Sequence, residues 1–128
     1  MILLWNSADM TVHLTLIDGD DRYHYDWQAG RELARDMLGY IRDRLADHSK
    51  QLDDIVGIGV LRGPGSYTGL RIGLTVLNTL ASARHIPIVG ATTDAWETKC
   101  LARLAAGDTD TIVLPEYGGE AHVTSPKK

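Results

Sequence analysis

The chain has 128 residues, of which 44% are hydrophobic and 23% charged, values typical of one ordinary globular domain rather than a disordered segment. The formal net charge of −4 argues against a protein that grips nucleic acid by itself, because neutralising phosphates takes a concentrated basic surface. No stretch reaches the roughly 18 apolar residues of a membrane span, and the single cysteine, Cys100, rules out an internal disulfide. We therefore expect a cytoplasmic protein without membrane contact that would reach RNA only through a partner.

The first part of the chain predicts three antiparallel strands. Residues 2–5 are apolar, and residues 10–17 alternate between two faces, as a half-buried strand does. The Asp-Gly-Asp-Asp run at 18–21 is a turn signal, and residues 22–27 form a third strand pattern after it. Short turns between consecutive strands indicate a meander.

The rest of the chain alternates helical and strand patterns. In order, these are a helix at 31–48, a buried strand at 55–61, a helix at 68–84, a strand at 86–89, a helix that begins near 93 or 94, and a hairpin at 111–124. Antiparallel strands followed by crossover helices predict an α/β fold, with a mixed sheet flanked by helices. This order of elements fits one lobe of the ribonuclease-H-like or actin-like architecture.

The two long helices carry wide apolar surfaces. The apolar arc of the helix at 31–48 spans about 160°, and the helix at 68–84 has two apolar faces that together span roughly 200°. Between Arg71 and Arg84 there is no charged residue. We therefore expect an interface with another subunit at Leu33, Met37, Tyr40, Ile41, Leu70, Leu74, Leu77 and Ala81. The alternative is that the third helix and the tail cover the helix at 68–84 within the monomer.

A glycine-rich loop lies between the buried strand and the second helix. Free backbone amides at a helix N-terminus, together with a nearby arginine, can hold an anion. The candidate residues are Gly63, Gly65, Ser66, Thr68, Gly69 and Arg71. The loop lacks the Lys-Ser/Thr pair of a P-loop and the Rossmann glycine spacing. The glycines can equally serve tight packing, with Ser66 or Thr68 capping the helix, so a phosphate- or nucleotide-binding module is the alternative function.

Other residue types give no convincing active site. The histidines show no pair at helical metal spacing, and surface or strand-edge positions are expected for all of them: His13, His24, His48, His85 and His122. Cys100 lies in a helical pattern among apolar residues, which indicates a core position rather than a nucleophile. We expect no catalytic residues, no metal and no cofactor.

Residues 62–74 read Arg-Gly-Pro-Gly-Ser-Tyr-Thr-Gly-Leu-Arg-Ile-Gly-Leu, with Gly57-Ile-Gly before them and Ile88-Val-Gly-Ala-Thr-Thr after them. This pattern resembles the signature of the TsaB (YeaZ) family, in which the loop reads Gly-Pro-Gly-Ser-Phe-Thr-Gly-Leu-Arg, so that Tyr67 stands in place of Phe. The resemblance covers residues 2 to about 104, and the hairpin predicted at 111–124 is similar to the start of the family's second lobe.

The resemblance implies a noncatalytic paralogue of the TsaD enzyme on the actin-like ATPase fold. Such a protein supports synthesis of the threonylcarbamoyl group on adenosine next to the anticodon of certain tRNAs. It implies pairing with a TsaD-like protein in a four-helix contact through the helices at 31–48 and 68–84, with a TsaE-like ATPase as a further partner. Contact with tRNA is then indirect, and both a monomer and a homodimer are open for the chain in isolation. Residues 1–106 are expected to form the actin-like N-terminal lobe, and residues 107–128 a residual hairpin of a truncated second lobe.

Two departures from the family pattern bear on the chemistry. Family members carry Asp-Thr-Ser at the end of the first strand, whereas this chain has Asn6-Ser7-Ala8, which removes the carboxylate that would orient metal-bound phosphate. The Asp-Ala-Arg of the family's second lobe appears here as Pro115-Glu116-Tyr117, and most of that lobe is missing. A hydrolase, suggested by the family's former grouping with metallopeptidases, is opposed by the lack of metal-ligand spacing.

Overall fold

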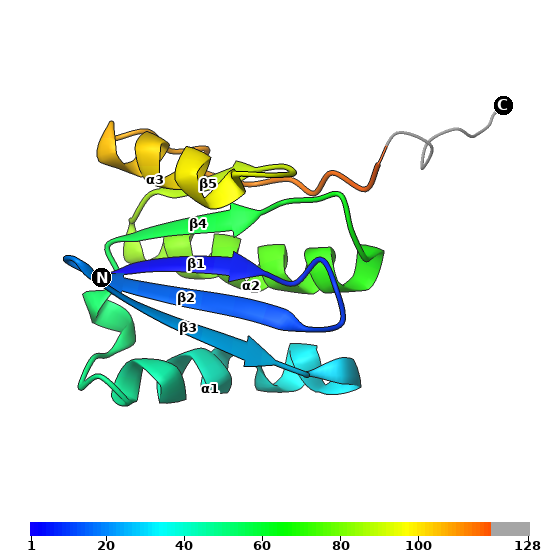
Figure 1. Ribbon diagram of the computed structural model, residues 1–128, viewed down its shortest axis with the longest axis horizontal. Coiled ribbons are helices and arrows are strands. Elements are labelled where there is room, and N and C mark those ends of the chain that lie inside the picture. The colour runs from blue at the N-terminus through cyan, green and yellow to red at the C-terminus, as the bar shows by residue number, and fades with distance from the viewer. Residues whose placement is uncertain (119–128) are drawn as a thin grey trace, which may run out of the picture.

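The chain folds around a mixed five-stranded sheet (Figure 1), and the computed structural model describes residues 1–118. The strands are β1 (Ile2–Asn6), β2 (Val12–Asp18), β3 (Asp21–Trp27), β4 (Gly57–Leu61) and β5 (Ile88–Ala91). They lie in the order β3-β2-β1-β4-β5. The first three pair antiparallel as a meander, whereas β4 pairs parallel with β1 and β5 parallel with β4. The predicted mixed sheet is confirmed.

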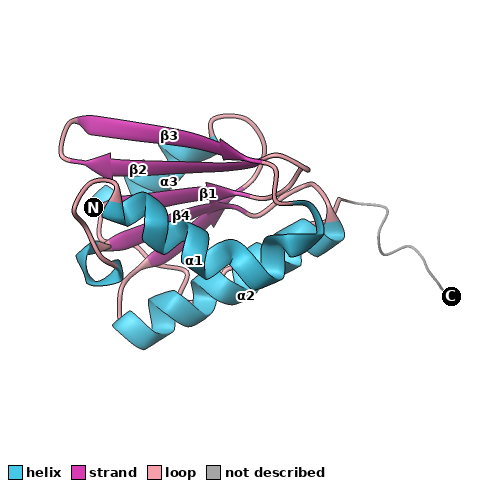
Figure 2. Cartoon of the chain, turned by 90° about the horizontal axis from the view of Figure 1, so that it is seen from below, coloured by secondary structure: helices cyan, strands magenta, loops and turns pink. Residues whose placement is uncertain are grey.

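In the part of the chain that the structure describes, three α-helices flank this sheet, two on one face and one on the other. The helices α1 (Leu33–Ala46) and α2 (Tyr67–Arg84) lie side by side on the same face, and α3 (Trp96–Ala105) covers β4 and β5 from the opposite face (Figure 2). Short 3-10 turns at Gly30–Glu32 and Leu52–Asp54 precede α1 and β4. Within residues 1–118, none of the helices combines the length and the apolar character that crossing a membrane requires.

The alternating pattern of β2 divides its side chains between two environments. Val12, Leu14 and Leu16 are buried in the main core, where they pack with side chains of α1 and α2. Ile17, on the other face, packs against the smaller cluster under α3. The face of β2 and β3 that looks away from α1 and α2 is not covered by α3, because α3 lies over β4 and β5. On this side the side chains of β3 are exposed, whereas those of β2 are half-buried or buried.

Glycines in β4 allow α3 to pack closely on the sheet. A Cβ atom placed on Gly59 would lie 2.8 Å from the Cβ of Cys100 and 2.7 Å from a methyl carbon of Leu4, closer than real Cβ atoms approach their neighbours. Cys100 is fully buried at this contact, and burial raises the pKa of its thiol to about 11. The thiol is therefore neutral near pH 7, and the predicted core position of Cys100 is confirmed.

The segment after α3 covers the edge of the sheet, but it does so without forming the strand predicted at 111–114. The main-chain N–H of Ile88 donates to the hydroxyl of Thr109, and the N–H of Gly90 donates to the carboxylate of Asp110. Side chains thus satisfy donors of β5 that a sixth strand would otherwise satisfy. The second strand of the predicted hairpin, at 121–124, lies outside the described residues.

Asp110 holds this segment in place. Its carboxylate also receives two hydrogen bonds from the guanidinium of Arg103, at 2.5 and 3.0 Å. The bonds from Arg103, followed by that from the N–H of Gly90, hold the pKa of Asp110 below its usual value. The carboxylate is therefore ionised when the segment is docked.

Replacing Asp110 with alanine should lower the free energy of unfolding by about 1 kcal/mol at pH 7, a modest amount because the Asp110 side chain is 31% exposed. Because folding depresses the pKa of Asp110, its stabilisation is complete above the unfolded value of about 3.9 and disappears as the pH falls through the folded value. Urea unfolding at pH 7 and pH 3 should therefore show a difference between wild type and Asp110→Ala that shrinks in acid. Asp108→Ala, which loses the bonds from Arg103 Nε and from the N–H of Thr109 but no bond to β5, is the control with a smaller expected effect.

Candidate subunit interface

Most of the residues expected at a subunit interface lie in the core of the chain itself. Seven of them are buried, with at most 6% of each residue exposed: Leu33, Met37, Ile41, Leu70, Leu74, Leu77 and Ala81. Tyr40 is half-buried, and its ring stacks on Trp27 of β3 with the ring centroids 4.2 Å apart. The assignment is therefore corrected: these side chains hold α1 and α2 onto the sheet and offer little surface to a partner.

Contacts within the same chain explain why the apolar arc of α2 is so wide. One stripe of the helix packs on the sheet, its flank contacts α1, and a further part meets the segment after α3. The side-chain amide of Asn78 exchanges two hydrogen bonds, of 2.8 and 2.9 Å, with the main chain of Val113, which is itself buried. The tail thus covers α2 as the internal-burial alternative proposed, whereas α3 lies on the other face of the sheet.

A different face of α2 remains open to solvent. We call it the α2 outward face, and its residues recur at three- and four-residue spacings: Thr68, Ile72, Thr75, Val76, Thr79 and Ala83. Ile72 and Val76 are half-buried, and the other four are exposed. A solvent-facing helix surface ordinarily carries charged residues, yet charge is confined here to the flanking Arg71 and Arg84.

Two of the three threonine hydroxyls of this face, those of Thr75 and Thr79, are satisfied within the helix. The hydroxyl of Thr75 donates to the carbonyl oxygen of Arg71 at 2.7 Å, and that of Thr79 donates to the carbonyl oxygen of Thr75 at 2.8 Å. Covering these residues would therefore leave no hydroxyl donor without a partner, which removes the usual penalty for burying a polar group. The α2 outward face is suited to burial against another surface.

The neighbouring helix adds a large apolar side chain to this surface. Leu38 of α1 is 41% exposed, and it projects from the side of the helix roughly opposite to Tyr40. Because Tyr40 packs against Trp27 of β3 at the edge of the sheet, the helical spacing places Leu38 on the flank of α1 that points away from β3. Leu38 and the α2 outward face together form the candidate interface.

The glycines of the loop between β4 and α2 are explained by close packing. A Cβ atom on Gly65 would collide with Ala8, one on Gly69 would collide with the carbonyl oxygen of Ser7, and one on Gly63 would collide with that of Glu116. Gly63 also has a φ of 135°, which other residues avoid. The loop is therefore wedged between the end of β1 and the C-terminal segment.

The polar groups of the same loop are largely committed to these contacts. The N–H of Ser66 donates to the carbonyl oxygen of Ala8 at 2.7 Å, and the hydroxyl of Ser66 accepts from the N–H of Gly69 as the N-cap of α2. Thr68 is exposed, and the guanidinium of Arg71 lies over the ring of Tyr67. An anion would find two fewer free N–H donors here than the sequence suggested, so no specific contact favours the phosphate-binding alternative.

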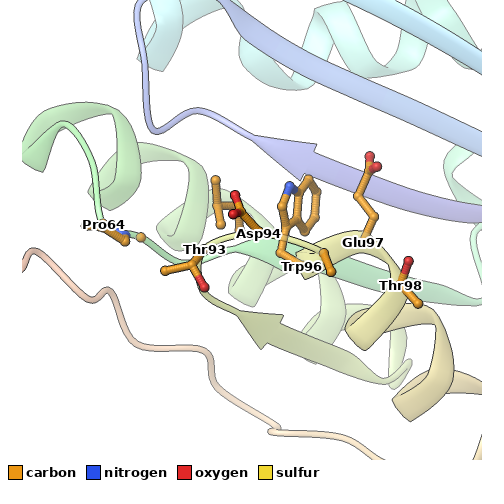
Figure 3. Close-up of a pocket in the computed structure, with 9 residues that line it drawn as sticks. Pro64, Thr93, Asp94, Trp96, Glu97 and Thr98 are labelled. Atoms are coloured by element: carbon orange, nitrogen blue, oxygen red, sulfur yellow. The ribbon is translucent and has the colours of Figure 1, made fainter.

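A cavity of about 670 Å³ opens where β4 and β5 end, the place at which parallel sheets commonly bind ligands (Figure 3). It is lined by Gly63 and Pro64 on one side and by residues 93–98, at the start of α3, on the other. The lining carries the carboxylates of Asp94 and Glu97 and, among the described residues, no basic side chain. This charge does not favour a free phosphate.

The structure also brings together residues that the sequence left scattered. His13 and His24, which show no helical metal spacing in the sequence, meet Asp26 on the open face of β2 and β3. The signal was present in the sequence, because counting outward from the predicted turn pairs residue 13 with residue 26 across the hairpin. His48 stacks on Tyr23, and His85 ends α2; His122 lies outside the described residues.

Comparisons with known proteins give the family of the chain. The family described as "TsaD: tRNA N6-adenosine threonylcarbamoyltransferase" matches residues 27–96, more than half of the chain and a range that contains α1 and α2. The tRNA threonylcarbamoyladenosine biosynthesis protein TsaB of Escherichia coli (strain K12) is 29% identical over 111 residues, which cover 82% of this chain and 43% of that protein. The tRNA N6-adenosine threonylcarbamoyltransferase of Syntrophus aciditrophicus (strain SB) is 40% identical over 62 residues, covering 48% of this chain and 18% of that enzyme.

Solved structures agree with this result. YeaZ from Pseudomonas aeruginosa superimposes with a TM-score of 0.68 at 24% identity, covering 83% of this chain and 49% of the other. The predicted actin-like, ribonuclease-H-like α/β fold is thereby confirmed. The chain spans less than half the length of the Escherichia coli protein that it matches. It belongs to the TsaD family defined above, and its sequence is similar to that of TsaB proteins over part of their length.

Proposed function

We propose that this chain is a noncatalytic subunit that pairs with a TsaD-like protein and so supports threonylcarbamoyl modification of tRNA. The proposal rests on the names of its relatives, which include both a TsaB biosynthesis protein and threonylcarbamoyltransferases. Residues 1–106 would act as the actin-like lobe, and residues 107–128 would belong to a second lobe. Without such a partner the chain would pair with a second copy of itself, and a TsaE-like ATPase would join the heterodimer.

One observation supports the choice of pairing surface. The α2 outward face is open to solvent, and it has no charged residue between Arg71 and Arg84. Leu38 extends this surface onto α1. Two parallel neighbouring helices with small and β-branched side chains can receive two helices of a partner, because small side chains allow helix axes to approach closely. The contact would therefore be a four-helix packing with α1 and α2 as one half.

A single charge in the middle of this face tests the pairing. We expect Thr79→Arg to weaken binding to the TsaD-like protein of the same source at least about thirtyfold, because a partner helix would bury an unpaired guanidinium. The free chain should remain folded, since Thr79 is exposed in it. Isothermal titration calorimetry of the two purified full-length proteins measures the effect, and circular dichroism checks the fold.

The matched control is Thr98→Arg, which places the same charge on an exposed threonine of α3, on the opposite face of the sheet. It should bind the partner as the wild type does. If Thr79→Arg also binds with unchanged affinity, the α2 outward face is not the pairing surface.

A further inference from the structure

The open face of the β2–β3 hairpin carries a cluster of metal-ligating side chains. His13 on β2 lies directly opposite Asp26 on β3, and the next pair along the same face joins Thr15 with His24. Ring nitrogens of His13 and His24 lie 2.6 and 2.9 Å from the same oxygen of Asp26, Oδ1. All three candidate ligand atoms lie within 4.8 Å of one another.

These distances suit a metal ion after small side-chain rotations. Ligands bound to zinc at about 2.1 Å lie roughly 3.3–4.2 Å apart, within the range that the three atoms already span. The two imidazole rings are nearly parallel, with centroids 5.8 Å apart, and both direct a nitrogen toward the carboxylate. The hairpin pairing fixes the Cα positions from which the three side chains project, so little chain ordering opposes binding.

A fourth residue orients one of the ligands. The hydroxyl of Thr15 lies 3.0 Å from Nδ1 of His24, the ring nitrogen that does not face Asp26. Thr15 is only 6% exposed, so its position is set by the sheet. Metal-binding histidines commonly use their second nitrogen in such a hydrogen bond, which fixes the tautomer and the direction of the ring.

The ligand atoms determine which metal ion fits the site, and the exposure of the side chains determines whether coordination positions stay open. Two imidazole nitrogens and one carboxylate oxygen favour borderline divalent ions such as zinc over magnesium or calcium, which prefer oxygen ligands alone. His24 and Asp26 are more than half exposed, so coordination positions remain open toward solvent. An ion held by three protein ligands keeps a position for water or for a group of another molecule.

We propose that His13, His24 and Asp26 form a zinc site of three protein ligands on the open face of the sheet, with Thr15 as a positioning residue. The site lies on the face opposite to α1 and α2, so it is independent of the pairing surface proposed above. In the zinc-bound site each imidazole would coordinate as a neutral ring through the nitrogen that faces Asp26, with its proton on the other ring nitrogen. For His24 that other nitrogen is Nδ1, which would donate to the hydroxyl of Thr15.

Calorimetric titration of the full-length chain, free of affinity tags, with zinc chloride at pH 7.5 tests the proposal. We expect one ion per chain, with binding weakened at least tenfold in His13→Ala and in His24→Ala. Cobalt should give a visible absorption band that the same variants lose. Thr15→Val keeps the shape of the side chain but removes the hydroxyl, and it should weaken binding while all three ligands remain.

His85→Asn provides the matched control, because it removes an exposed histidine outside the cluster and asparagine tolerates the φ of 57° at that position. It should bind zinc as the wild type does. The proposal is overturned if the wild type shows no binding at millimolar zinc, or if His13→Ala and His24→Ala bind with unchanged affinity while circular dichroism shows that they are folded.

Discussion

Leu77→Arg should leave the chain largely unfolded at room temperature, whereas Thr79→Arg, two residues further along α2, should melt within a few degrees of the wild type. Leu77 is completely buried in the main core. Its replacement removes a leucine whose loss alone costs about 2–5 kcal/mol, and it adds the burial of an unpaired charge, which costs several more. The total is comparable with the whole stability of a small domain, about 5–15 kcal/mol.

Far-UV circular dichroism and thermal melting of the two variants measure this contrast. The comparison matters for any study of pairing, because a charge at Leu74 or Leu77 would abolish association by unfolding the subunit. A folded Leu77→Arg protein with a near-native melting temperature would show that α2 is not packed on the sheet as described.

The second large effect concerns Gly73 in α2. In an exposed helix, replacing glycine with alanine stabilises by about 1 kcal/mol. At Gly73 the added Cβ would lie 2.5 Å from the hydroxyl oxygen of Ser7 and 2.7 Å from Nε1 of Trp5, both of which are buried. The hydroxyl of Ser7 accepts from Trp5 and donates to the carbonyl oxygen of Gly69, so it has no room to move without losing a bond.

We therefore expect Gly73→Ala to lower the free energy of unfolding by about 2 kcal/mol, because overpacking and the lost hydrogen bonds exceed the gain in helix propensity. Gly39→Ala in α1 is the matched control, since nothing lies within 4 Å of a Cβ built there. It should stabilise the chain by about 0.5–1 kcal/mol. Urea unfolding of both variants decides the sign, and a stabilised Gly73→Ala would contradict the tight contact between α2 and β1.

Periodicity predicted the order of elements in the chain because burial on a sheet imposes a regular spacing on apolar residues. It could not say which stripe of α2 stays exposed. Leu70, Leu74 and Leu77 are buried in the structure, whereas Ile72 and Val76 are half-buried at the edge of the core, beside the exposed threonines. What covers a helix depends on contacts from distant parts of the chain, such as the one between Asn78 and Val113.

Two further differences have the same origin in long-range contacts. Residues 111–114 are β-branched or apolar and predict a strand, but the edge that such a strand would pair with is already occupied by Thr109 and Asp110. Helical spacing rules do not detect the histidine cluster, because His13 joins His24 and Asp26 only through the pairing of β2 with β3. Local sequence patterns thus determine the helices and strands, whereas the histidine cluster depends on how the strands pair.

The two edge strands of the sheet differ, because side chains satisfy main-chain groups of β5 but not those of β3 among the described residues. At β5 the main-chain N–H groups with which a strand of another molecule would pair already donate to the hydroxyl of Thr109 and the carboxylate of Asp110. At β3 the margin is free among the described residues, but it presents the ionisable side chains of Arg22, His24 and Asp26. Charged groups on a border strand discourage strand-by-strand growth into fibrils. The molecule is therefore protected from this form of aggregation at both ends of its sheet.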